Sequence, residues 1–148
     1  MKFITTTLAA LVLTAATVFA AGEGWGTDAK VAQAQAKKDG KFVLLDFTGS
    51  DWCPPCIQLH KNVLDTANFK ELAKKSLVLV ELDFPRKKAQ ADALKNANRE
   101  LSEKYKIEGF PTLIVLNGDG KELWRQVGYG GDSAKAVVGQ IEKAISKK

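Results

Sequence analysis

The chain has 148 residues, with 22 lysines and arginines against 17 aspartates and glutamates and a formal net charge of +5. This length is enough for one domain with a hydrophobic core. The positive charge is mild and scattered along predicted helices, without the clustering or aromatic support that nucleic-acid binding requires, so we expect no nucleic-acid partner.

The first twenty residues have the pattern of a secretory signal peptide. Lys2 precedes an apolar run over residues 8–19, and small residues around Ala20 suit cleavage after it. An uncleaved membrane anchor is the alternative, but the run is short for a span and is diluted by threonines. We therefore predict a signal peptide over 1–20 and a mature domain over 21–148. We expect a periplasmic or secreted protein with no stable membrane insertion after cleavage.

A helix and then a strand follow the predicted signal peptide. The Gly-rich segment that comes first reads as an irregular arm. Thr27 or Asp28 is a suitable cap for a helix over 29–39, which Gly40 ends. A continuous apolar run with β-branched and aromatic members then predicts a strand over 42–48, buried on both faces.

The middle of the chain predicts two further helices around a second strand. Helical sequence runs over 54–75 with a break near Asp65, and another apolar run predicts a buried strand over 76–84. Apolar residues at spacings of three and four then predict a long amphipathic helix over 86–105.

The last third predicts a hairpin and a closing helix. Strands over 112–116 and 122–127 flank four turn residues at 117–120, and Asp132 is a suitable cap for an amphipathic helix after it. Early strands that alternate with helices should be parallel, and the hairpin should add an antiparallel edge. The sequence therefore predicts an α/β fold with a small mixed sheet and helices on both faces.

The only two cysteines, Cys53 and Cys56, flank Pro54 and Pro55. A disulfide across so short a loop removes little unfolded-state entropy, so a structural staple is a poor explanation. At the first two positions of a helix the prolines cost nothing, because those amides have no intrahelical partner. Cys53 should then point toward solvent with its thiolate favoured by the helix start, while Cys56 is shielded. This arrangement suits thiol–disulfide exchange in an oxidising compartment.

Zinc binding and copper binding are alternatives to a redox function of the two cysteines. A structural zinc site needs four ligands, and His60 is the only further soft or borderline candidate nearby. A metal site shared between chains, or copper carriage by the dithiol, stays open. Covalent haem attachment is excluded because Ile57, and not histidine, follows Cys56. We interpret His60 itself as a half-exposed helical residue, since it lies a turn beyond Cys56 and further from Cys53.

Four motifs in order resemble the thioredoxin family over most of the mature chain. "LLDF" resembles the strand with a buried acid, and "WCPPC" the strand-to-helix redox motif. "GFPT" resembles the cis-proline loop, and "NGDGKELWRQVGY" the closing hairpin. The chain is similar to secreted bacterial thioredoxin-like proteins. The resemblance implies a thioredoxin fold, with a central mixed four- to five-stranded sheet flanked by helices.

The resemblance also implies a role for each site residue. Cys53 would attack substrate disulfides and Cys56 would resolve the mixed disulfide. Pro111 would be a cis-proline that exposes backbone groups beside Cys53 to a substrate strand. Trp52 would pack beside the pair and contact partners. Asp46 would be the buried carboxylate that assists proton transfer at Cys56, with a pKa raised by desolvation.

The sequence departs from the family pattern in two places. From Asp46 to Cys53 the chain advances by seven positions (53 minus 46), one more than is typical of the family. The family often pairs the buried acid with a lysine on the neighbouring strand, and Leu79 aligns there, followed by Glu81 and Asp83. That ion pair is therefore expected to be absent; if Glu81 faces inward, its titration should couple to that of Asp46.

These features predict an exported thiol–disulfide oxidoreductase that acts as a reductant or isomerase. No cationic residue lies between the cysteines to stabilise the thiolate, which favours a reducing potential. Expected partners are exported protein thiols and disulfides, together with a membrane electron donor. No cofactor is expected, because the dithiol carries the electrons. The alternative is a periplasmic copper carrier that uses the same two sulfurs.

Overall fold

The computed structural model describes residues 24–147, so the predicted signal peptide over 1–20 lies outside the described residues. Their strands form one five-stranded sheet in the order β1-β3-β2-β4-β5. The strands are β1 (Trp25–Gly26), β2 (Phe42–Thr48), β3 (Leu77–Asp83), β4 (Thr112–Leu116) and β5 (Glu122–Val127). The helices are α1 (Ala29–Asp39), α2 (Pro54–Leu59), the π-helical turn η1 (His60–Leu64), α3 (Ala67–Ser76), α4 (Asp92–Lys104) and α5 (Ala134–Ile145).

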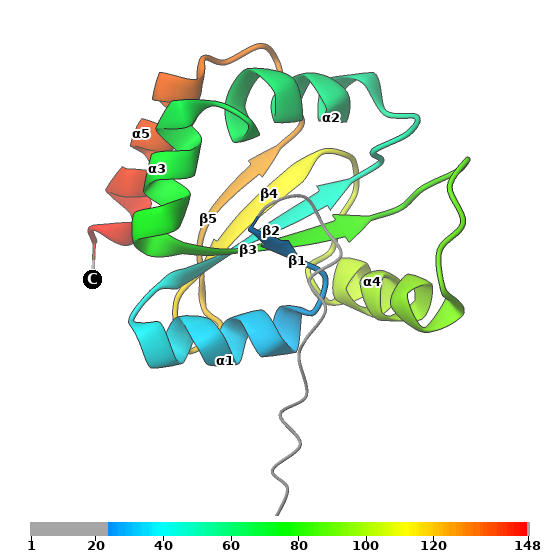
Figure 1. Ribbon diagram of the computed structural model, residues 1–148, viewed down its shortest axis with the longest axis horizontal. Coiled ribbons are helices and arrows are strands. Elements are labelled where there is room, and N and C mark those ends of the chain that lie inside the picture. Colours follow the sequence, from blue (N-terminus) through cyan, green and yellow to red (C-terminus); the bar gives the residue numbers. More distant parts are fainter. Residues whose placement is uncertain (1–23, 148) are drawn as a thin grey trace, which may run out of the picture.

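The sheet is mixed, as the sequence predicts. Strands β1, β3 and β2 are parallel, whereas β4 is antiparallel to β2 and pairs with β5 in the hairpin. The central strand β2 is buried at all seven positions. Figure 1 shows it in the middle of the sheet, between layers of helices.

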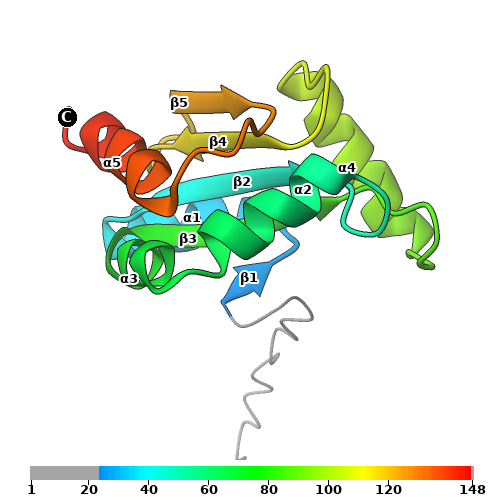
Figure 2. The ribbon, with the colours of Figure 1, turned by 90° about the horizontal axis from the view of Figure 1, so that it is seen from above.

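Two hydrophobic cores fill the space on the two sides of the sheet. Helices α2, η1, α3 and α5 pack on one face, where Leu44, Leu79 and Leu113 meet Phe69 and Ile141. Helices α1 and α4 pack on the other face, and Figure 2 shows this layering from above. Because successive strand residues point to opposite faces, alternate residues of β2 and β3 belong to alternate cores.

Local signals set the ends of the first helix. The Asp28 carboxylate accepts hydrogen bonds from the amides of Lys30 at 2.8 Å and Val31 at 3.0 Å, which makes it the N-cap of α1. Gly40 ends the helix with φ at 66°, a left-handed conformation that glycine adopts without a steric penalty. The predicted cap and the predicted stop are both confirmed.

Three expectations about the elements were wrong. The arm before α1 contains the short strand β1, which pairs with β3 at Leu79 and Val80. Helix α4 starts at Asp92 rather than at 86, because a loop tied to Asp51 occupies the intervening residues. Ser133, rather than Asp132, caps α5 by accepting from the Ala136 amide.

The packing of α5 generates a stability prediction. Ile141 is fully buried, whereas Ile57 is 49% exposed. Ile141→Ala should lower the free energy of unfolding by about 2–5 kcal/mol, because it removes buried methyl groups and leaves a cavity. Ile57→Ala, the matched control, should change it by about 0.5 kcal/mol or less. Urea denaturation of the oxidised protein measures both, and equal effects would contradict the assigned core.

Candidate active site

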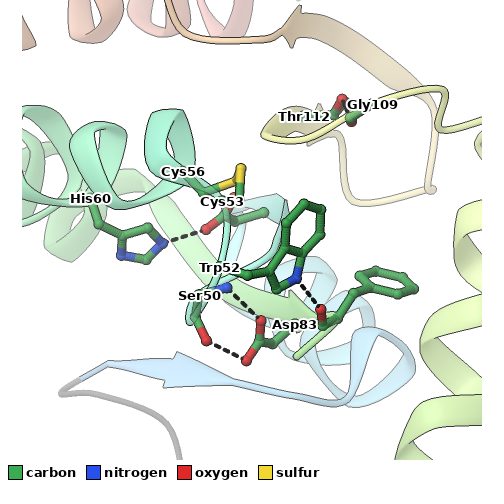
Figure 3. Close-up of a disulfide and its surroundings, with 10 residues drawn as sticks. Ser50, Trp52, Cys53, Cys56, His60, Asp83, Gly109 and Thr112 are labelled. Carbon is green, nitrogen blue, oxygen red and sulfur yellow. Dashed lines mark hydrogen bonds and ion pairs between the residues drawn. A yellow bond between two sulfur atoms is a disulfide. The ribbon is translucent and has the colours of Figure 1, made fainter. Parts of the chain in front are cut away.

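The cysteine pair lies where strand β2 leads into helix α2. Cys53 is the N-cap residue, and Pro54 and Pro55 occupy the first two helical positions, as the sequence predicts. Cys53 and Cys56 form a disulfide with their Cα atoms 5.3 Å apart. Figure 3 shows the pair above the strands of the sheet. Two first-turn amides are missing because of the prolines, and the Ile57 amide donates to the Cys53 carbonyl at 3.1 Å.

The disulfide is more deeply covered than the sequence suggested. Cys53 is 3% exposed and Cys56 is fully buried. Their order of exposure agrees with the expectation, but Cys53 does not point freely into solvent in the disulfide form. A partner thiol therefore meets only a small exposed surface on Cys53 in this form.

Asp46 lies in the middle of β2, on the face that helices α2 and η1 cover. It is fully buried, and its Oδ1 atom has no hydrogen-bond partner among the described residues. Strand register places Glu81 of β3 directly beside it. The expectation that Leu79 occupies this position was wrong, since Leu79 pairs with Leu44. Leu79 and Glu81 point to the same face, so Glu81 turns inward toward Asp46.

His60 contacts the buried carboxyl directly. Its Nε2 atom lies 2.7 Å from Asp46 Oδ2, and its side chain is 25% exposed. The dashed line from His60 in Figure 3 marks this contact. His60 begins the π-helical turn η1, in which the Asp65 amide bonds back to the His60 carbonyl at 2.8 Å. Our interpretation of His60 as an ordinary half-exposed residue was incomplete, because it missed this partner.

Burial and mutual charge shift the pKa of each group in this cluster. Burial raises the pKa of Asp46 above its ordinary value of 3.8, although the hydrogen bond from His60 opposes that rise. Burial lowers the pKa of His60, but the hydrogen bond and charge of Asp46 outweigh it and the net shift is upward. The pKa of Glu81 is raised by burial and by the negative charge of Asp46. The three groups therefore titrate as one coupled cluster.

Trp52 is held in place from several sides. Its Nε1 donates to the Phe84 carbonyl at 2.7 Å, and the Arg86 guanidinium lies 3.6 Å from its ring centroid. The ring of Phe110 meets it edge-on, with centroids 6.0 Å apart. The indole also lies over Gly49, where an added Cβ would come within 2.6 Å of it. Only glycine at this position leaves room for the ring.

Two aspartates fasten the loop before Cys53 to the end of β3. Asp51 accepts hydrogen bonds from the amides of Arg86, Lys87 and Lys88 at 2.8–3.0 Å. The hydrogen bond from the Arg86 amide is the largest of several that lower the pKa of Asp51 to about 2. Asp83 accepts from both the amide and the hydroxyl of Ser50.

The loop between α4 and β4 completes the surroundings of the pair. The Phe110–Pro111 peptide bond is cis, and Pro111 is buried. The Pro111 carbonyl accepts from the Gly128 amide at 2.7 Å, and the Thr112 hydroxyl donates to the Gly109 carbonyl at 2.8 Å. Figure 3 shows Gly109 and Thr112 on this loop.

Four of the five residues singled out from the sequence lie beyond the end of the sheet where β2 stops and β4 starts, and the fifth, Asp46, lies further in on β2. Cys53, Cys56 and Trp52 lie at the start of α2, Asp46 lies on β2, and Pro111 precedes β4. Sequence reasoning missed three neighbours of these residues: His60, Arg86 and Asp51. The inward position of Glu81 had a signal, because residues two apart on a strand share a face and Glu81 is two residues from the apolar Leu79.

The fold and this site define a thioredoxin-fold protein with a dithiol–disulfide centre, and comparison with known proteins agrees. Residues 29–144 match the family described as the thioredoxin-like domain. The chain belongs to the thioredoxin-like family.

Several relatives have names that describe thiol–disulfide chemistry. The chain is 36% identical over 128 residues to disulfide bond reductase DsbH of Chlamydia pneumoniae, covering 86% of this chain and 76% of the relative. It is 28% identical to thioredoxin-related protein DsbJ of the same organism, covering 74% of this chain but 31% of that relative. A solved structure titled DsbH oxidoreductase superposes with a TM-score of 0.78 at 32% identity, covering 95% and 96% of the two chains. The chain is therefore a thiol–disulfide oxidoreductase.

Two further findings concern residues 24–147 alone. None of the helices described there is both long and apolar enough to cross a membrane. In the same range, no three His, Cys, Asp or Glu side chains are grouped so that they could hold a metal ion.

The raised pKa values in the cluster of Asp46, Glu81 and His60 predict how the stability of the protein depends on pH. The folded pKa values of Asp46, Glu81 and His60 lie above their ordinary values of 3.8, 4.5 and 6.5. Between the ordinary and the raised pKa of each group, the folded state therefore binds more protons than the unfolded state. Stability is lost as the pH rises through that range. The melting temperature of the oxidised protein should fall from about pH 5 to about pH 8, and less steeply in Asp46→Asn. A constant or rising melting temperature would contradict the direction of these shifts.

The three amides bonded to Asp51 give a second prediction. Asp51→Ala removes their acceptor, so the amides of Arg86, Lys87 and Lys88 should exchange hydrogen faster with solvent. Hydrogen exchange followed by NMR measures this directly. Asp119→Ala, which removes the same charge from an exposed ion pair with Lys37, is the matched control. Equal exchange in both variants would show that Asp51 does not order this loop.

Proposed function

We propose that this chain is an exported enzyme that reduces or isomerises disulfides in other exported proteins. The observation that carries the proposal is the Cys53–Cys56 pair at the first turn of α2, with the buried carboxyl of Asp46 in contact with His60 at the end of that helix. Export rests on the signal-peptide pattern of residues 1–20. The name of the relative DsbH, a disulfide bond reductase, supports the reducing direction.

The reaction begins at Cys53. In the reduced enzyme the Cys53 thiolate attacks one sulfur of a substrate disulfide; a Cys53–substrate disulfide forms, and the other substrate sulfur leaves as a thiolate. The Cys56 thiol then gives its proton to the ionised Asp46. The resulting Cys56 thiolate attacks the Cys53 sulfur, which closes the Cys53–Cys56 disulfide and releases the second substrate thiolate. Two electrons have passed from the enzyme dithiol to the substrate.

Asp46 suits the role of proton acceptor for the resolving step. Cys56 and His60 are four residues apart and share a helix face, and His60 contacts Asp46. The free Oδ1 atom of Asp46 leaves one carboxylate oxygen available for a proton. Burial raises the pKa of Asp46 and so makes it a stronger base than an exposed aspartate.

Trp52 and the Pro111 loop are the proposed contact surface for substrate. Trp52 is ordered by Phe84, Arg86 and Phe110, so it presents a fixed aromatic surface beside Cys53. The backbone of the Phe110–Pro111 loop offers hydrogen-bonding groups to an extended peptide. Main-chain pairing of this kind binds many different sequences.

The first turn of α2 supports the reducing direction. Stabilising the Cys53 thiolate would favour the reduced form and make the pair oxidising. Pro54 and Pro55 lack amide hydrogens, and the Ile57 amide is already bonded, which leaves the Cys56 amide for the sulfur. Weak thiolate stabilisation favours a reducing potential. A reductant in an oxidising compartment needs recharging, and we propose a membrane electron donor.

Substitution of the two cysteines tests the reaction. Cys53→Ser should abolish reduction of a disulfide-bonded reporter peptide, because the attacking sulfur is gone. Cys56→Ser should instead accumulate a mixed disulfide at Cys53, which mass spectrometry detects. Undiminished reduction by Cys53→Ser would refute the assignment. Copper carriage would gain support if the wild type were inactive while its dithiol bound Cu(I) tightly.

The redox potential tests the role of the prolines. Pro54→His should make the potential more oxidising than that of the wild type, because it restores an amide and adds a titratable ring beside Cys53. Equilibration with glutathione measures the potential of each protein. Gln58→His, on the exposed side of the same helix, is the control for adding a histidine. An unchanged potential in Pro54→His would mean that the prolines act through rigidity or partner fit.

A further inference from the structure

The contact between His60 and Asp46 joins a group with access to solvent to one with none. His60 is a quarter exposed, whereas Asp46 is fully buried on the central strand. The distance of 2.7 Å between Nε2 and Oδ2 is that of a charge-assisted hydrogen bond. An ionised carboxylate can only accept, so Nε2 is the donor whenever Asp46 is ionised.

Because of the strand register, the ionisation of Asp46 depends mainly on its contact with His60. The residue opposite Asp46 on β3 is Glu81, so that neighbour adds a second acid instead of a compensating cation. Asp83, two residues further along the same strand face, adds more negative charge. Burial and the charge of Asp83 oppose ionisation of Asp46. Among the described neighbours that act on its charge, His60 is the group that favours it.

We infer that His60 is a positioning residue for the redox reaction, which keeps the buried Asp46 ionised and able to take the proton of Cys56. This inference rests on the proposed role of Asp46 in the resolving step. His60 acts through Asp46 and does not itself touch the sulfur atoms. Because the charge on the imidazole changes with its protonation, the resolving step depends on pH through His60 as well as through the cysteines.

The surroundings of His60 keep its proton in exchange with solvent. A groove of about 680 Å³ runs along the β1 side of the sheet and is lined by His60, Glu81 and Trp25. The Trp25 ring lies 5.9 Å from the imidazole and supports its orientation. The imidazole ring therefore connects a buried acid to an open surface.

Charged groups from every packed element face His60 and contribute to its titration. Asp46 comes from β2, Glu81 from β3, and Asp65 from the end of η1. Three lysines that also line the groove carry the opposite sign: Lys41, Lys70 and Lys74. Lys41 donates to the Lys74 carbonyl at 2.9 Å, so its ammonium is engaged away from the imidazole.

Single-turnover kinetics over a pH series tests the inference. The reduced protein is mixed with dithiobis-nitrobenzoate, which releases one coloured thiolate when Cys53 attacks and a second when Cys56 resolves. In His60→Phe, which keeps a ring against Trp25, the pH midpoint of the second release should move upward by about one unit or more. In His60→Gln, which keeps a hydrogen-bond donor without the charge, the pH midpoint should lie between those of the wild type and His60→Phe. Glu81→Gln should move the midpoint downward.

Two controls separate this role from a structural one. Lys61→Gln removes an exposed cation from the same turn and should leave the profile unchanged. His60 is the single histidine of the chain, so its NMR titration is unambiguous in the full-length mature protein. Its pKa should fall in Asp46→Asn, because the carboxylate that raises it is gone.

The outcomes distinguish this inference from the proposed function. An unchanged second-phase midpoint in His60→Phe, or an unchanged histidine pKa in Asp46→Asn, would overturn the role of His60. If the wild type attacks the probe but releases no second thiolate, the proposed resolving step fails. A lowered histidine pKa in Asp46→Asn would then still support the coupling between the two side chains.

Discussion

The burial of a carboxyl group in the middle of the central strand is the constraint around which this site is built. Every residue of β2 is buried, and Asp46 is the acidic one among them. A buried charge is costly unless it is paired and hydrogen-bonded. The π-helical turn that starts at His60 brings a donor to one carboxylate oxygen and leaves the other free. The helix that carries the cysteines is thereby fastened to the strand that carries the acid.

A second set of acids orders the rim of the site. Asp51 takes three backbone amides from the loop after β3, and Asp83 takes two hydrogen bonds from Ser50. These contacts join the segment before Cys53 to the loop that supplies Arg86 and the Phe84 carbonyl for Trp52. The aromatic surface beside the disulfide is therefore set before a partner arrives, which lowers the entropy cost of binding.

Local signals made most of the fold predictable from the sequence, and tertiary contacts explain the failures. The bounds of α1 and β2 and the positions of both prolines follow from caps, breaks and apolar runs. Strand β1 could not be predicted from the sequence, because its two residues form a strand only by pairing with β3. The start of α4 depends on a distant carboxylate, Asp51. The partner of Asp46 depends on a π-helical turn, which has no short-range sequence signature. An inward Glu81 was considered from the sequence only as a condition, and the strand register now places it beside Asp46.

The position of strand β1 connects the predicted signal-peptide cleavage with the groove beside His60. Gly24 and Trp25 line the same groove as His60 and Glu81. If cleavage follows Ala20, a new α-amino group is created at Ala21, four positions before Trp25 (25 minus 21). Such groups titrate at about pH 7.7–8.0 and are cationic below that range. Cleavage there would add a positive charge to the sequence that leads into the strand beside this groove, where the precursor has an uncharged peptide bond.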